Sequence, residues 1–270
     1  MGIMDRNMMI RLDRQMLLDF YSLGAWVHQY TATALYHEAQ RIPADAEIAG
    51  GDKPRIQAAL RAKILAEAVA SMETLGRFCF AVEHRIQNGF AAAYVNQSHN
   101  VANEFYQDIL NLGSINVNPD TLLTKLELPS LQQLQHLPLE DDVNEFLTLL
   151  SDLLGRIAER YIDDDPNPTA RRKLTQAYNA IKHGSHVVGN PPVLTAPFHG
   201  TFEQQAITII RQWPIRDQDI TSDSLIFVQR SLSQEAVMED LQIITDIAKA
   251  LSNLCQMLIV LLDQNLLTYN

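Results

Sequence analysis

Apolar residues recur at intervals of three and four along most of this chain, a spacing that predicts amphipathic helices. The first such segment extends from residue 5 to residue 42 and contains no proline, so we expect one long helix there. Its apolar stripe consists of Met16, Leu17, Phe20, Leu23 and Val27. Pro43 and a turn that contains two glycines follow, and they predict the end of this helix.

The same pattern predicts further helices. The second begins near Pro54, a residue favoured in the first turn of a helix, and extends to residue 87. A third is expected over residues 91–112. In a fourth, residues 140–162, the apolar positions step by four and three, which is the spacing of a heptad seam. The last helix, residues 233–267, has two adjacent apolar stripes, so we expect a wide buried face.

Two segments break the helical pattern. Residues 113–138 contain irregularly spaced leucines and three prolines, which predicts an irregular connection with short helical turns. Residues 206–213 and 224–231 are rich in β-branched and aromatic residues and are separated by a polar loop, so we expect a small antiparallel sheet. The predicted fold class is mainly α. We expect one domain, residues 1–270, a bundle of five or six long helices with a β insert at about 185–230 before the C-terminal helix.

Charge and cysteine content restrict the functional classes. The net charge of −11 would repel a phosphate backbone unless basic residues cluster, and residues 171–173 are the best basic run. Cys79 and Cys255 lie in apolar segments and predict buried free thiols in a reducing cytoplasm. The N-terminus does not resemble a secretory signal. The longest apolar run, residues 257–262, is far shorter than the roughly 20 residues that cross a bilayer, so no membrane span is expected.

Metal and cofactor motifs are not recognisable in the sequence. The acidic run at residues 163–169 lacks the glycine and the distal glutamate of an EF-hand. His183 and His186 are three apart but lie on either side of Gly184, which interrupts a helix. The chain also lacks a phosphate loop, a dinucleotide fingerprint, a nucleophile elbow and a zinc-binding cysteine pattern. We therefore expect no metal and no cofactor.

The stretch "QAYNAIKHGSHVV", residues 176–188, supports two interpretations. In the first it ends the helix that begins at Pro168. Cationic Lys182 and His183 suit the negative end of the helix dipole, and Gly184 can close the last turn in the left-handed conformation.

In the second interpretation the stretch is a site. Positions 172, 176, 179 and 183 are spaced by four, three and four, so their side chains share one helix face. They are Arg172, Gln176, Asn179 and His183. Packing does not require an aligned polar face, and Asn179 lies one turn before His183, where it could orient the imidazole or share a ligand with it.

The segment "YNAIKHG", residues 178–184, resembles the motif of the HEPN superfamily, whose ribonuclease members carry arginine, a polar residue, three variable residues and histidine. Asn179 matches the polar position and His183 matches the histidine. Tyr178 occupies the position of the arginine that the resemblance assigns to the phosphate, and a tyrosine does not carry a permanent positive charge. Arg172 lies about 16 Å from His183 along a helix axis, so it cannot take the role of the missing motif arginine. The resemblance thus favours a relative that has lost cleavage over an active ribonuclease.

Two functions remain open from the sequence. In one, a HEPN-like cytoplasmic protein of bacterial defence or of a toxin–antitoxin system contacts RNA or a nucleotide through Arg172, Tyr178, Asn179, Lys182 and His183. The resemblance also implies a homodimer. In the other, the chain is a non-enzymatic helical interaction protein, or scaffold, that binds a protein partner, and residues 182–184 only end a helix.

A second polar constellation lies on the predicted second helix. Glu73, Arg77 and His84 are spaced by four and seven and therefore share one face. The spacing favours an ion pair between Glu73 and Arg77, and a solvent-exposed face explains all three residues. If this helix packs against the helix that carries His183, Glu73 is a candidate partner for the imidazole.

Overall fold

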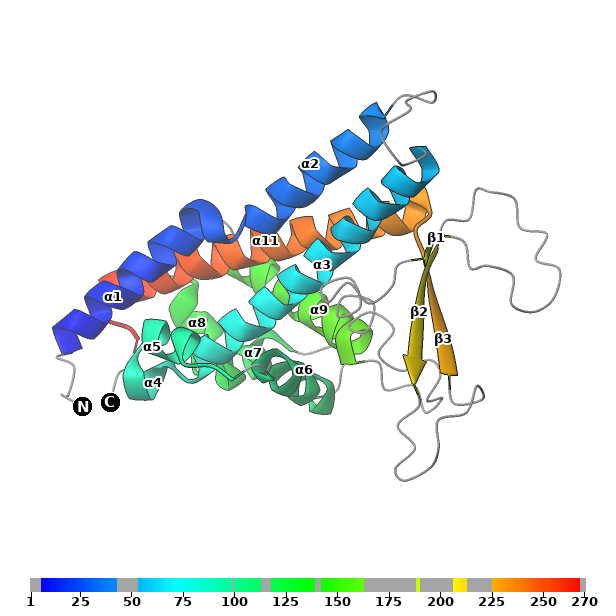
Figure 1. The fold of residues 1–270 in the computed structure, drawn as a ribbon. Helices are drawn as coiled ribbons and strands as arrows, with labels where there is room; N and C mark the ends of the chain where they lie inside the picture. The colour runs from blue at the N-terminus through cyan, green and yellow to red at the C-terminus, as the bar shows by residue number, and fades with distance from the viewer. Residues whose placement is uncertain are drawn as a thin grey trace. The chain divides into compact units, whose positions relative to one another are not determined.

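The structure, a computed structural model, describes residues 6–42, 53–98, 100–112, 118–138, 142–162, 188–189, 206–212 and 225–267. Helices make up most of these residues (Figure 1), so the predicted mainly α class is confirmed.

The first predicted helix is divided into three elements. These are α1 (Arg6–Asp19), a π-helical turn η1 (Phe20–Gly24) and α2 (Val27–Arg41). In the π turn, the N–H of Ala25 donates to the carbonyl oxygen of Phe20 at 2.8 Å, five residues back, so this turn contains one extra residue. The prediction of one continuous helix over residues 5–42 is therefore wrong at this turn.

The π turn also divides the predicted apolar stripe of this segment. Leu17 is buried, whereas Leu23 and Val27 are exposed. One extra residue in the turn rotates every later side chain about the axis by about 100°, the rotation of one α-helical residue. The α-helical period of the sequence therefore placed Leu23 and Val27 on the wrong face.

The second predicted helix is confirmed as α3 (Lys53–Glu83), which is followed by the short α4 (Arg85–Asn88). The third is interrupted: α5 (Phe90–Val95) and α6 (Val101–Asn111) are separate helices. Residues 96–100 contain Asn and Ser, whose side chains compete for backbone hydrogen bonds and favour turns. A continuous helix over 91–112 is therefore wrong.

The remaining helices follow the predictions. Two short ones, α7 (Pro119–Lys125) and α8 (Leu131–Leu134), lie in the segment predicted as irregular with helical turns. The predicted heptad helix is confirmed as α9 (Val143–Ile162), and the C-terminal helix as α11 (Gln234–Asp263).

By length and composition alone, α11 could cross a membrane. This is weak support for a span, because core helices pass the same test and 56% of the apolar window is buried.

Three short strands are described between α9 and α11: β1 (Val188–Gly189), β2 (Ala206–Gln212) and β3 (Leu225–Ser231). Both strand pairs are antiparallel, and β2 pairs with both β1 and β3. Most of residues 163–224 lie outside the described part of the chain. The extent of the β insert, about 185–230, therefore stays a prediction.

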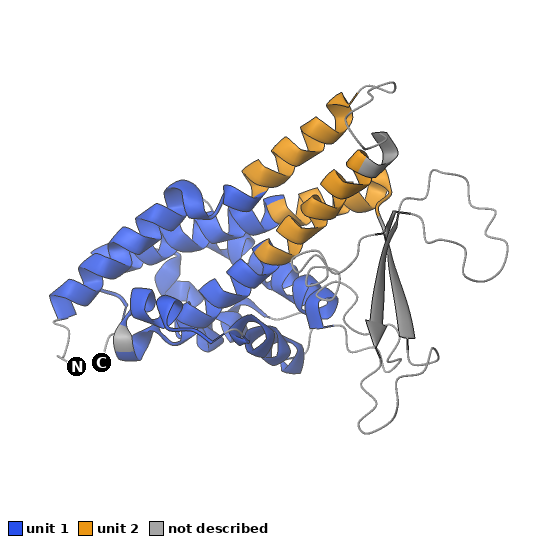
Figure 2. Ribbon diagram, in the orientation of Figure 1, with its two compact units in different colours: residues 1–28, 71–162, 245–270 blue, residues 29–70, 163–244 orange. Residues whose placement is uncertain are grey.

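The chain divides into two compact units (Figure 2). Unit 1 contains residues 1–28, 71–162 and 245–270, and unit 2 contains residues 29–70 and 163–244. In unit 2 the described core is a buried cluster of Ala32, Ile64, Ala68, Val237 and Ile244. In unit 1 the phenol of buried Tyr106 donates to the carbonyl oxygen of Met72 at 2.6 Å and joins α6 to α3. The single-domain expectation for residues 1–270 stays a prediction.

Candidate functional site

The site predicted from the HEPN resemblance lies outside the described residues. Its members are Arg172, Tyr178, Asn179, Lys182 and His183, all within residues 163–187. Both interpretations of this stretch, a site and a helix end, therefore stay predictions.

The structure places the second polar constellation, on α3 and just after it, without bringing its three residues into one site. Glu73 accepts a hydrogen bond from the phenol of Tyr161 at 3.3 Å. Arg77 donates to the amide oxygen of Gln97 at 3.0 Å. The ring of His84 stacks on Phe80 with centroids 4.0 Å apart. Each side chain thus has a structural contact of its own.

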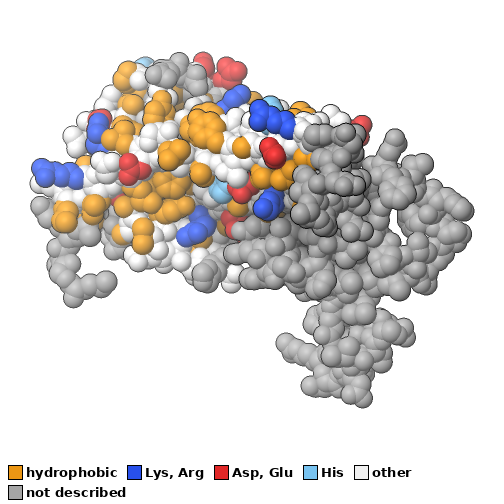
Figure 3. All heavy atoms as spheres, turned by 45° about the horizontal axis from the view of Figure 1, so that its top comes forward, with side chains coloured by type: hydrophobic (Ala, Val, Ile, Leu, Met, Phe, Trp, Pro, Cys, Tyr) orange, Lys and Arg blue, Asp and Glu red, His pale blue; other side chains and the backbone are white. Residues whose placement is uncertain are grey.

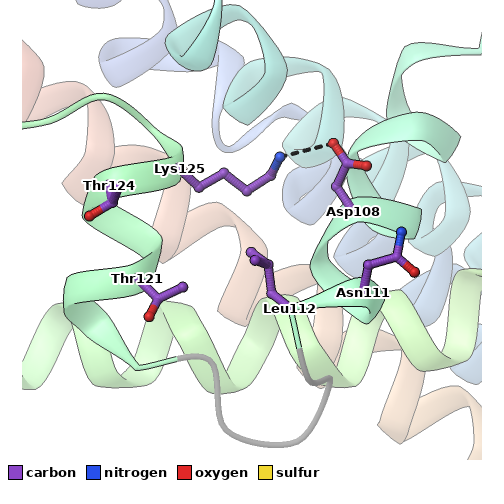
Figure 4. A pocket seen from close by; sticks show the side chains of 6 residues that line it. All are labelled: Asp108, Asn111, Leu112, Thr121, Thr124 and Lys125. Carbon is purple, nitrogen blue, oxygen red and sulfur yellow. Dashed lines mark hydrogen bonds and ion pairs between the residues drawn. The ribbon is translucent and has the colours of Figure 1, made fainter.

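An open pocket lies between α6 and α7 (Figure 4). Its volume is about 470 Å³, within the range of small-molecule sites. Its lining is Asp108, Asn111, Leu112, Thr121, Thr124 and Lys125. Asn118 and Pro119 fix the start of α7, because the Asn118 side chain caps the helix by accepting from the N–H of Asp120 at 2.9 Å.

An ammonium group shared by two carboxylates dominates this pocket. Lys125 Nζ lies 3.0 Å from Asp108 Oδ2 and 3.2 Å from Glu83 Oε1. It also lies 5.4 Å from the centre of the Phe105 ring, which favours the cation. The Lys125 side chain is only 11% exposed. The lysine therefore connects the end of α3, α6 and α7, and the three charges sum to −1.

The chemistry of the pocket is limited by these internal contacts. The Thr124 hydroxyl donates to the carbonyl oxygen of Asp120 at 2.8 Å, so its proton is already used. Asn111 and Thr121 can bind a small polar molecule, but the lining contains no nucleophile next to a base. In the part of the chain that the structure describes, no cluster of three or more His, Cys, Asp or Glu residues could hold a metal ion.

Sequence reasoning did not identify this pocket. Asp108 and Lys125 are 17 residues apart, with an irregular segment between them. Their meeting depends on the path of the chain between α6 and α7, which no periodic pattern encodes.

A second feature is an exposed apolar surface on one side of α1, η1 and the start of α2, which we call the α1–α2 face. It consists of Met8, Leu12, Leu23 and Val27, with exposed fractions of 55%, 42%, 59% and 44%. All four residues belong to unit 1. Figure 3, turned so that the side of α1 and α2 comes forward, shows hydrophobic side chains gathered between charged ones.

The geometry of the helix places these four side chains on one side. At about 100° per residue, Met8 and Leu12 lie about 40° apart. With the extra residue of the π turn counted, Leu23 and Val27 lie in the same arc, and all four side chains fall within about 80°. The opposite side carries Asp13, Leu17 and Ala25, which are 1%, 1% and 3% exposed. The face is therefore the side opposite the core.

The described residues thus define a mainly α-helical protein with an open pocket between α6 and α7 and an exposed apolar helix face. The chain matches no protein-family model, no curated protein and no solved structure.

Proposed function

We propose that this chain is a non-enzymatic helical interaction protein that binds a protein partner through the α1–α2 face. The observation that carries the proposal is the concentration of Met8, Leu12, Leu23 and Val27 in one solvent-exposed arc. Single exposed apolar residues are common, but several of them on one helix side are typical of a protein-binding surface. A partner helix or surface could contact all four side chains together.

The pocket between α6 and α7 supports the same proposal by its limited chemistry. Lys125 is held between Asp108 and Glu83, and the pocket lining offers no activated nucleophile. These side chains stabilise the contact of three helices, which is a structural role.

The test is quantitative affinity purification from the cells that express the protein, with mass spectrometry of the bound proteins. We expect the wild type to retain a specific protein and the L12E/L23E variant to lose it, because two buried carboxylates would be costly in an apolar interface. The matched control is L149E, since Leu149 on α9 is also exposed and apolar. Equal retention by wild type and L12E/L23E would contradict the proposal.

A second candidate function rests on a specific sequence feature. The four-residue spacing of Asn179 and His183, on one predicted face with Arg172, favours a HEPN-like site that contacts RNA or a nucleotide, with Tyr178 and Lys182 beside it. Tyr178 in place of arginine argues against cleavage. Bacterial defence or a toxin–antitoxin system is the setting that the resemblance implies.

The test of the second candidate is the NMR titration of His183, assigned with H183A and repeated with short RNA and mononucleotides. A pKa displaced from about 6.5 and displaced again by an added ligand supports a site. An ordinary pKa that no ligand changes rejects it. If the His183 pKa is displaced and an added ligand changes it again, we expect Y178R to restore RNA cleavage.

Two further features belong to these proposals. A cytoplasmic location is supported by the two free, buried cysteines, since disulfides are rare in reducing compartments. A β-containing insert at about 185–230 is supported by the β-branched residues of that segment and by the three strands described within it.

A further inference from the structure

We propose that the α1–α2 face binds the same face of a second copy of this chain, with the helices antiparallel about a two-fold axis. This inference rests on the proposed function, because it names the occupant of the same surface. Its basis is the self-complementarity of the face in the positions of its apolar residues, its hydrogen-bonding groups and its charges.

The apolar positions of the face read the same in both directions. Their spacing is four, eleven and four residues, so the numbers of Met8 and Val27 sum to 35, as do those of Leu12 and Leu23. In a two-fold interface, if residue i contacts residue j of the partner, then j contacts i. An antiparallel pair centred between residues 17 and 18 therefore places Met8 opposite Val27 and Leu12 opposite Leu23, twice each.

The π turn is compatible with this arrangement. At about 100° per residue, Leu12 and Leu23 would lie about 20° apart in a continuous α-helix, and the extra residue in η1 places them about 80° apart. In both cases the four side chains stay within about 100° of arc, so the self-complementary spacing does not depend on the turn.

The centre of the face is polar and also self-complementary. The Gln15 amide donates to the Asp19 carboxylate at 2.9 Å, and both residues are exposed between the two apolar pairs. The amide has a second N–H, and the carboxylate has further lone pairs. In the antiparallel register, Gln15 of one copy lies next to Asp19 of the other, so the second N–H can donate across the axis. A polar pair at the centre of an apolar interface fixes its register.

The charges on the face favour the antiparallel over the parallel arrangement. In parallel helices, Asp19 would lie opposite a second Asp19, and Arg11 opposite a second Arg11, which is repulsive. In the antiparallel register, Arg11 lies opposite Gly24 and Asp19 lies opposite Met16. No like charges meet on the face in this arrangement.

The first measurement is sedimentation equilibrium of the full chain over a range of concentrations. We expect a dimer of twice the 30.4 kDa chain mass. L12E/L23E is expected to sediment as a monomer, since each dimer would then bring together four carboxylates, and L149E to remain a dimer. Circular dichroism of each variant checks that the fold is retained.

Cross-linking with a short bis-maleimide tests the register and does not depend on the charged variants. Cys79 and Cys255 are buried, so they do not compete for the reagent. The variants L12C and L23C, carrying tags of different size, are incubated alone and as a mixture. We expect cross-linked dimers only in the mixture, because residue 12 of one copy faces residue 23 of the other. The two copies of residue 12 lie about 16 Å apart along the helix axis, too far for a short cross-linker.

The outcomes separate this inference from the proposed function. Cross-linking of L12C with itself, or a dimer that survives L12E/L23E, overturns the antiparallel pairing. A wild type that is monomeric at every concentration overturns self-association altogether. In that case the proposed function still stands if the affinity purification finds a different protein that binds the wild type and not L12E/L23E. If no protein is lost from L12E/L23E, the proposed function fails as well.

Discussion

The carboxylate of Asp13 accepts a hydrogen bond from the backbone N–H of Phe90, at a distance of 2.8 Å. Its other oxygen accepts from the N–H of Ala91, also at 2.8 Å. Asp13 is buried in α1, and Phe90 is the first residue of α5. The residue before α5 is Gly89, which has no side chain to cap the helix, so a residue 77 positions away in the sequence supplies the N-terminal cap.

Removal of this carboxylate is expected to destabilise the fold. D13A leaves the buried N–H of Phe90 and the partly buried N–H of Ala91 without this acceptor, and it should lower the free energy of unfolding by about 1–3 kcal/mol. D13N keeps one oxygen acceptor and should fall between D13A and the wild type. Urea unfolding measures the difference. The control is D152A, at an exposed position of α9, for which we expect a change below about 0.5 kcal/mol; an equal loss in both alanine variants would contradict the cap.

Substitution of Gly89 tests the same contact from the other side. Gly89 has a φ of 82°, and an added Cβ would lie 3.1 Å from both oxygens of Asp13. G89A should therefore cost at least about 1 kcal/mol, from the backbone conformation and the close contact together. In a double-mutant cycle with D13A we expect less than additive losses, because D13A removes the contacted oxygens. Strictly additive losses would show that the two residues do not interact.

The close approach of α3 and α6 depends on Gly76. A Cβ at this position would lie 2.8 Å from Cε2 of Tyr106 and 3.1 Å from Cβ of Ala102. G76A is expected to force the helices apart and to cost about 1–3 kcal/mol, although alanine is the better helix former. Thermal unfolding of G76A and of K63A, an exposed control on the same helix, measures this. A G76A variant as stable as K63A would mean that α6 can move without cost.

The buried guanidinium of Arg85 holds the end of α7. It donates to the carbonyl oxygens of Val82, Leu126 and Glu127, and the Leu126 contact measures 2.7 Å. Glu127 has a φ of 52°, so the chain leaves α7 in a left-handed conformation that these bonds support.

R85M is expected to lower the free energy of unfolding by at least about 3 kcal/mol, because several buried carbonyls lose their donor. R156M is the control, since Arg156 is largely exposed and its contact to Asp246 is 3.9 Å long. Both variants are compared by urea unfolding. If R85M is no less stable than R156M, the guanidinium does not hold α7 in place.

Alkaline pH is expected to destabilise the protein through its buried thiols. Burial raises the pKa of the Cys79 thiol well above its ordinary value of 9.0, with a contribution from the Glu83 carboxylate, and burial raises that of Cys255 in the same way. The folded state therefore keeps these protons where the unfolded chain releases them. The contribution of each buried thiol to the free energy of unfolding is complete below pH 9. Above pH 9 this contribution decreases by about 1.4 kcal/mol per pH unit for each thiol.

The measurement is urea unfolding at several pH values between 8 and 9.8 in the wild type and in C79A, since the titration of the tyrosines is common to both proteins and cancels in the comparison. C79A is expected to show a shallower decrease than the wild type above pH 9, whatever its stability at pH 8. Identical pH dependence in the two proteins would mean that Cys79 is not protected from ionisation in the folded state.

Most of the helices were predictable because their signals are local. The heptad spacing of residues 140–162 predicted α9 to within three residues at its start, and the apolar stripes of residues 233–267 predicted α11. The interruption between α5 and α6 also had a local signal, since Asn96, Ser98 and Asn100 all favour turns. That signal was outweighed by the helix formers on both sides.

The sequence by itself thus determined where most helices form and that the chain is mainly α, because hydrophobic periodicity acts over a few turns of backbone. Tertiary structure alone decided the rest. The cap that Asp13 supplies to α5 and the position of Lys125 between Asp108 and Glu83 join parts of the chain whose meeting depends on three-dimensional packing. The π turn that exposes Leu23 is local, but the helical period of the sequence does not indicate it. A buried charge contradicts residue-type averages, and only neighbouring elements show why it is stable.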